Sequence, residues 1–80
     1  MGKEIFPGIE VDADKLGGKP VIKGTRISIE LILERLAAGD SIEDLLEAYP
    51  HLSKEDIKRA LVFAAKILSL EEFRDLPDAA

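Results

Sequence analysis

Apolar residues recur at helical spacing in two segments in the middle of the chain. In each segment they fall at positions i, i+3, i+4 and i+7, which places them on one face of an α-helix. These residues are Ile29, Ile32, Leu33 and Leu36 in the first segment and Ile42, Leu45, Leu46 and Tyr49 in the second. Ser28 can cap the first helix, and either Asp40 or Ser41 can cap the second. Since Gly39 and Pro50 are residues at which helices end, the pattern predicts helices over residues 28–38 and 41–49.

A third and longer segment, residues 53–70, is apolar on two faces. Ser53 can cap its N-terminus, and Leu52 and Ile57 have the spacing of the hydrophobic staple that flanks such a cap. One apolar stripe, which we expect to face the core, contains Ile57, Ala60, Leu61, Ala64 and Leu68. A second stripe lies round the side of the helix and contains Val62, Phe63, Ile67 and Leu70. Because an apolar helix face must be buried, the second stripe predicts contact with a second subunit or a foreign partner.

The residues before the first helix have the pattern of short strands. Ile5, Ile9 and Val11 alternate with polar residues, as in an edge strand or a strand exchanged between two subunits, although Pro7-Gly8 interrupts the alternation. The run over residues 17–29 places an apolar pair between two glycine turns and predicts a strand–turn–strand element.

Three helices joined by short connections predict a small bundle. We therefore expect a mostly α fold, a small three-helix homeodomain-like helix-turn-helix bundle preceded by short N-terminal β-strands. Its parts are an arm over residues 1–16, a helix-turn-helix domain with its β lead-in over residues 17–70, and a short acidic tail over residues 71–80. In a helix-turn-helix the second helix enters the major groove of DNA by its N-terminal residues, and here that helix begins near Ser53.

Two groups of polar and basic residues are the candidate DNA contacts. They are Ser53, Lys54, Lys58 and Arg59 at the start of the third helix, and Lys19, Lys23 and Arg26 in the turns before the first helix. Each group also has a structural interpretation. The third helix can present an ordinary solvated face on which Glu55 pairs with Arg59. In the turns, the lysines can serve solubility alone while Arg26 pairs with Glu30.

Composition narrows the class of protein. The 80 residues carry a net charge of −5, and six acidic residues lie between Glu30 and Tyr49 against a single base, Arg35, which does not favour nonspecific binding to nucleic acid. The absence of cysteine excludes disulfides and thiolate zinc sites. The apolar runs are too short to cross a bilayer and the N-terminal residues MGKEIFPG lack the apolar region of a signal peptide, so we expect a soluble, cytoplasmic protein. A core this small is often completed by a second copy, which predicts a homodimer.

Nothing in the sequence has the pattern of a catalytic, metal or cofactor site. His51 is the single histidine and has no cysteine, second histidine or nucleophilic serine beside it. Lys23-Gly24-Thr25 has the residues of a phosphate-binding loop in the wrong order. We therefore expect a protein that is not an enzyme and holds no cofactor or metal.

Several short motifs resemble one known family, catalogued as domain of unknown function 433. They are Gly18-Lys19-Pro20, Gly24-Thr25-Arg26-Ile27, Ala37 to Gly39, Tyr49-Pro50-His51-Leu52 and Asp56-Ile57, which fall here in the family's order. The resemblance implies a homeodomain-like helix-turn-helix, often dimeric through its N-terminal strands. It also implies a VapB-like antitoxin that acts beside a PIN-like ribonuclease toxin and represses its own operon.

The hypothesis that follows is a non-enzymatic antitoxin and transcriptional autoregulator. The residues expected to bind the toxin are Phe63, Ile67, Leu70, Phe73, Arg74 and Leu76. Among them Arg74 can approach the carboxylates of a PIN-like nuclease site and offset their charge. The alternative is a protein-interaction module without a DNA target, which the acidic balance favours.

Overall fold

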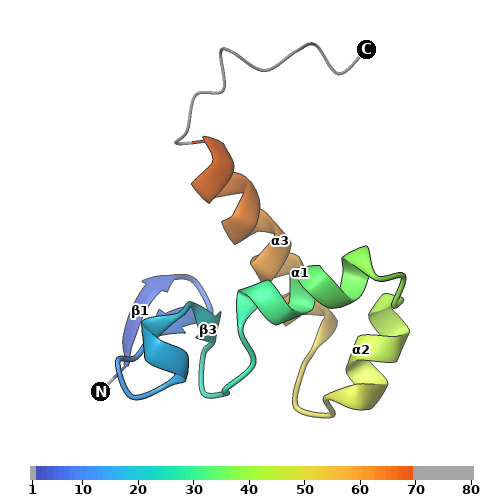
Figure 1. The fold of residues 1–80 in the computed structure, drawn as a ribbon, viewed down its shortest axis with the longest axis horizontal. Helices are drawn as coiled ribbons and strands as arrows, with labels where there is room; N and C mark the ends of the chain where they lie inside the picture. Colours follow the sequence, from blue (N-terminus) through green and yellow to red (C-terminus); the bar gives the residue numbers. More distant parts are fainter. Residues whose placement is uncertain (1, 70–80) are drawn as a thin grey trace.

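The computed structural model describes residues 2–69, which form three α-helices and a three-stranded antiparallel sheet (Figure 1). The elements are strands β1 (Lys3–Phe6), β2 (Ile9–Val11) and β3 (Val21–Ile22), the single 3-10 turn η1 (Leu16–Gly18), and helices α1 (Ile29–Ala37), α2 (Ile42–Ala48) and α3 (Lys54–Ser69). The strands lie in the order β1-β2-β3. Three helices after a small N-terminal sheet are what the apolar pattern predicts, and this much is confirmed. No helix within residues 2–69 has the length and apolar character needed to cross a membrane.

The first strands form a hairpin within one chain. β1 pairs antiparallel with β2, and the Pro7-Gly8 step that interrupts the sequence alternation is the turn between them. Gly8 adopts a φ of 80°, which a residue with a side chain rarely adopts, and its backbone N–H donates a hydrogen bond to Glu4 Oε2 at 3.0 Å. The segment expected as one alternating strand is therefore two strands, β1 at the edge of the sheet and β2 at its centre.

The strand–turn–strand element expected over residues 17–29 is only half present. β3 pairs with β2, but the chain that returns after the turn at residues 23–24 forms a single bridge, between Ser28 and Val21. The Thr25 hydroxyl closes this turn by donating to the Ile22 carbonyl at 2.7 Å and accepting from the Ile27 N–H at 3.0 Å. A second strand has no room because Ser28 is already the N-cap of α1.

All three helices begin at the serines that the sequence suggests. Ser28 Oγ accepts the Leu31 N–H at 2.9 Å. Ser41 and Asp44 form a reciprocal capping box, with hydrogen bonds of 3.0 and 2.8 Å, so the alternative cap at Asp40 is not used. The same reciprocal pair, at 3.1 Å in both directions, joins the residues at positions 53 and 56 before α3. These caps fix where each helix starts, and hence which residues face the core.

One hydrophobic core joins the sheet to the helices. Its buried residues are Ile9, Ile22, Ile29, Ile32, Leu45, Leu52, Ile57, Ala60 and Phe63. The expected division of α3 into two stripes is wrong in one respect: Phe63 is only 8% exposed, whereas Leu61 and Leu68, assigned to the core, are 43% and 60% exposed. The reason is the hairpin, because Phe6 packs its ring against Phe63 with centroids 5.6 Å apart and turns the buried face of α3 toward β1.

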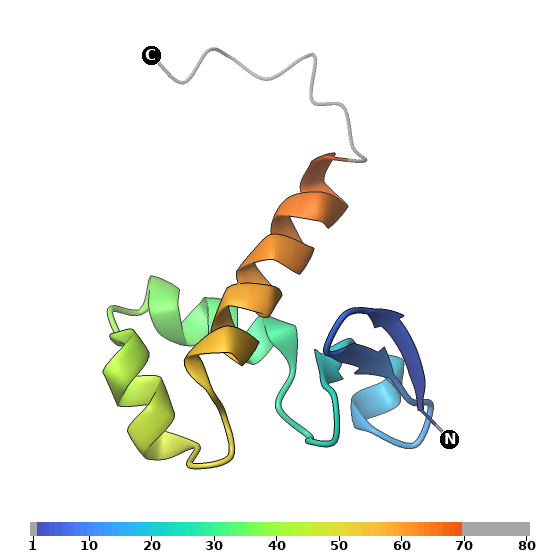
Figure 2. The same ribbon diagram turned by 180° about the vertical axis from the view of Figure 1, so that it is seen from behind.

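The three helices differ in how far their neighbours cover them. α1 and α2 lie within the body, while α3 crosses α1 and its last turns extend beyond the other elements (Figures 1 and 2). Four large apolar side chains on this part of α3 are between 42% and 60% exposed: Leu61, Val62, Ile67 and Leu68. We call residues 61–69 the α3 overhang.

Candidate functional site

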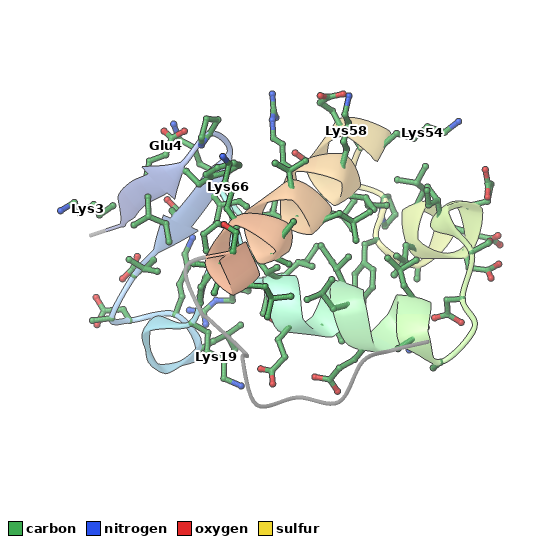
Figure 3. The ribbon with its side chains drawn as sticks, turned by 90° about the horizontal axis from the view of Figure 1, so that it is seen from above. Lys3, Glu4, Lys19, Lys54, Lys58 and Lys66 are labelled. Atoms are coloured by element: carbon green, nitrogen blue, oxygen red, sulfur yellow. The ribbon has the colours of Figure 1, made fainter. Side chains whose placement is uncertain are left out.

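The first turns of α3 carry two unpaired lysines on one exposed edge. Lys54 and Lys58 are four residues apart, and Figure 3 shows both pointing outward from the body. The side chain of neither forms a hydrogen bond or an ion pair with another residue in the described range 2–69. We call Lys54 and Lys58 the basic edge. Their positive charges remain available to an external acceptor.

The acids interleaved with the basic edge do not all face solvent. Asp56 caps α3 through the Ser53 N–H, and its side chain is 19% exposed. Asp56 also lies 3.7 Å from Arg59, which replaces the Glu55–Arg59 pair expected from the sequence. The Arg59 side chain crosses the hairpin turn so closely that a Cβ at Gly8 would stand 2.7 Å from its Cδ atom. Arg59 is therefore held against the hairpin, while the two lysines are not held.

The basic residues before α1 do not form one group. Lys23 pairs with Glu4 of β1 at 2.9 Å, and Lys19 pairs with Glu30 of α1 at 2.6 Å. The hydrogen bond to Glu30 raises the pKa of Lys19. The expected pair between Arg26 and Glu30 is absent, because Lys19 occupies that carboxylate. Arg26 is exposed and lines a shallow hollow of about 370 Å³ that Lys19 also lines, whereas Lys23 does not line it.

A larger, apolar groove separates α1 from the α3 overhang. Its volume is about 440 Å³, and its lining residues are Lys19, Pro20, Ile29, Glu30, Leu33, Glu34, Phe63, Ala64, Ile67 and Leu68. The floor is made of aliphatic and aromatic side chains, and the charged residues stand at the rim. The groove exists because α3 continues past the point where α1 and the sheet can pack on it (Figure 2).

Two charged residues, one at the groove and one on the α3 overhang, were not singled out by the sequence. The Glu34 side chain at the rim makes no hydrogen bond or salt bridge with another described residue, although its charge helps to raise the pKa of Lys19. Lys66 is the only charged residue in the overhang, and its side chain is likewise unpaired among residues 2–69. An isolated lysine within an apolar run is visible in the sequence, and Figure 3 shows its side chain on the hairpin side of α3, away from α1.

The residues expected to bind a toxin are divided by the structure. Phe63 belongs to the hydrophobic core and is only 8% exposed, although it also lines the groove. Ile67 is 47% exposed and lines the groove directly. Leu70, Phe73, Arg74 and Leu76 lie outside the described residues.

The perturbed carboxylates belong to structural contacts. The hydrogen bond from Lys15 and the Gly24 N–H lower the pKa of Glu10, and those from Lys23 and the Gly8 N–H lower that of Glu4. Within residues 2–69 no three histidine or acidic side chains gather closely enough to hold a metal ion. The described surfaces thus offer charge and apolar area for binding, whereas Glu4 and Glu10, whose pKa values are lowered, already serve contacts within the hairpin and the turn before α1.

Comparison with known proteins gives concordant results. Residues 9–64 match the model of a family described as protein of unknown function (DUF433). Over 51 residues the chain is 45% identical to the uncharacterized protein y4eO of Sinorhizobium fredii; the match covers 64% of this chain and 23% of that protein. The crystal structure of a DUF433 member from Anabaena variabilis superposes with a TM-score of 0.73 at 25% identity, covering 79% of this chain and 62% of the other. The chain thus spans about a quarter of the curated relative's length.

Proposed function

The chain belongs to the DUF433 family of proteins of unknown function, and we propose that it is a non-enzymatic DNA-binding regulator of the antitoxin type. In this proposal α2, the turn at residues 49–53 and α3 act as a homeodomain-like helix-turn-helix. The basic edge of α3 approaches the major groove, and a PIN-like ribonuclease toxin is held elsewhere on the chain.

The observation that carries the proposal is the state of the charges at the start of α3. In the sequence, this segment contains two acids and three bases. In the structure, Asp56 caps the helix by accepting the Ser53 N–H and lies 3.7 Å from Arg59. Lys54 and Lys58 remain unpaired within the described chain and point away from it (Figure 3). In a helix-turn-helix, unpaired lysines on the exposed edge of its second helix, which here is α3, can contact phosphate oxygens and base edges of DNA.

The proposed binding of a toxin rests on the sequence of residues 70–76. Leu70, Phe73 and Leu76 supply apolar anchors there, and Arg74 supplies one positive charge among four acids. A PIN-like nuclease gathers carboxylates in its active site, so the arginine suits that partner. Replacing Phe73 with Ala should abolish inhibition of the toxin, and replacing Arg74 with Ala should weaken it.

Fluorescence anisotropy with DNA from upstream of the protein's own gene tests the DNA side. The wild type should bind this duplex more tightly than a shuffled one, with an affinity that falls steeply as salt is raised. Changing Lys58 to Gln should weaken binding and reduce the salt slope by about 0.9 if the lysine contacts one phosphate. Lys3 is an exposed lysine on β1, and its change to Gln is the matched control. Equal affinity for both duplexes, or equal effects of the two variants, would exclude the proposed interface.

A second candidate, a protein-interaction module without a DNA target, is favoured by one observation. Glu43 and Glu47 lie exposed on α2 and form no salt bridge among the described residues, so a DNA backbone near α2 would meet negative charge. The same anisotropy series separates the candidates, since this module would leave both duplexes unbound even at low salt.

A further inference from the structure

We infer that the groove between α1 and the α3 overhang is a binding site for a small cationic amphiphile, that is, a molecule with an aliphatic or aromatic body and one ammonium group. The body lies on the apolar lining, and the ammonium group lies beside Glu34 at the rim. The inference does not rest on the proposed DNA interface, because neither Lys54 nor Lys58 lines the groove. Figure 3 shows Lys19, which does line it, on the side of the molecule away from these two lysines.

The groove has the size and the lining of a site for a small molecule. Its volume of about 440 Å³ falls within the range of about 300–1,000 Å³ that is usual for ligand pockets, which are mostly apolar with a few polar groups in fixed places. Ile29 and Phe63 are buried core residues, so the core packing fixes the part of the lining that they form. Ile67 and Leu68 line the groove from α3 and are 47% and 60% exposed. A bound apolar body would remove these two side chains from water, which favours binding.

Glu34 supplies the charge that selects the head group of the ligand. Three charged residues within the described range line the groove. Lys19 and Glu30 pair with one another at 2.6 Å, whereas Glu34 makes no salt bridge with another residue in the range 2–69. The formal charge of the lining is therefore negative by one unit. An ammonium group beside Glu34 is attracted by this charge, and an anionic head group is repelled by it.

The charges next to the groove do not reverse this preference. Arg26 also makes no ion pair within residues 2–69, but it lines the adjoining shallow hollow and not the groove. An anionic head group would have to leave the groove to reach it. By sequence, residues 70–80 carry four acids against one arginine, so this part of the chain is a poor match in charge for a rim that is already negative. A cation from outside the chain is the better match.

Titration of the isotope-labelled full chain, followed by NMR, tests the inference with three decyl compounds. They are decyltrimethylammonium, decyl maltoside and decyl sulfate, each used below the concentration at which it forms micelles. The three share one alkyl chain and differ in the charge of the head group. The cation should bind most tightly and the sulfate least tightly, with saturable shifts of the amide signals of Leu33, Ala64 and Leu68. Changing Glu34 to Gln should weaken binding of the cation by up to about fivefold, as expected for one exposed charge pair.

Reversal of the charge gives the sharpest comparison. Glu34→Lys should invert the order, so that decyl sulfate binds more tightly than decyltrimethylammonium. Glu47→Lys is the matched control and should keep the wild-type order, because Glu47 is exposed on α2 and lines neither the groove nor the hollow. Ile67→Ala should weaken binding of all three compounds to a similar extent, by about threefold or more. Val62→Ala should leave the three affinities unchanged, since Val62 is exposed on α3 but does not line the groove.

Circular dichroism should give the same helix content for the wild type and each variant. If Glu34→Lys alters the helix content, the smaller change Glu34→Gln decides the test. Affinities that do not depend on the charge of the head group would overturn the inference. So would an order that neither change at Glu34 affects, or amide shifts centred on α2 in place of the groove. Tightest binding of decyl sulfate to the wild type would overturn it as well, and would indicate that Arg26 attracts an anion.

Discussion

Phe63 offers the sharpest test of the packing, because the sequence and the structure assign it to different surfaces. Its ring is 8% exposed and lies 5.6 Å from the ring of Phe6, at an interplanar angle of 59°. Its neighbour Val62, which belongs to the same stripe in the sequence pattern, is 42% exposed. Truncation of each side chain to Ala should therefore have very different consequences.

The expected loss can be worked from these contacts. Burying a phenylalanine side chain is worth about 1.5–3 kcal/mol, and a tilted aromatic pair adds about 0.5–1.5 kcal/mol. The cavity left behind adds to this sum, so Phe63→Ala should lower the free energy of unfolding by about 3–5 kcal/mol. Val62→Ala should cost about 1 kcal/mol or less because its site is already hydrated.

Urea unfolding followed by circular dichroism, at one fixed protein concentration, measures both losses. An 80-residue domain has about 4–12 kcal/mol of stability in total, so Phe63→Ala can fall below the threshold for folding. Phe63→Leu keeps most of the apolar volume and should lose about 1–2 kcal/mol, which keeps the measurement possible. If Phe63→Leu and Val62→Ala both unfold at the wild-type urea concentration, Phe63 is not packed against Phe6.

Three further predictions concern the turns and caps. Gly8→Ala should lower the free energy of unfolding by about 1–2 kcal/mol, since it forces a side chain into a positive φ and pushes Arg59 aside. Gly24 has a similar φ of 78°, but a Cβ there would meet no atom within 4 Å, so thermal melts should find Gly24→Ala the milder change. Ser41→Ala removes the acceptor for the Asp44 N–H and should cost about 1 kcal/mol by urea unfolding, and no loss would contradict the capping box. The hydrogen bond from the Ser41 N–H lowers the pKa of the Asp44 carboxyl below its usual 3.8. The charged carboxylate therefore stabilises the fold above pH 3.8, and this contribution disappears as the pH falls through the lowered pKa. Thermal melts at neutral and acid pH should find Asp44→Asn less stable than the wild type only at neutral pH.

The sequence alone predicts where the helices begin and end, but it does not predict which of their faces pack together. The three serine caps and the residues that end each helix act within one turn, so their spacing is visible in the chain. The buried face of α3 depends on Phe6, more than fifty residues earlier, and no periodicity within α3 could reveal it. The partners of Lys19 and Lys23 are likewise distant in sequence, on α1 and β1. The groove needs the crossing of α1 and α3, which sets its length and brings Glu34 to its rim.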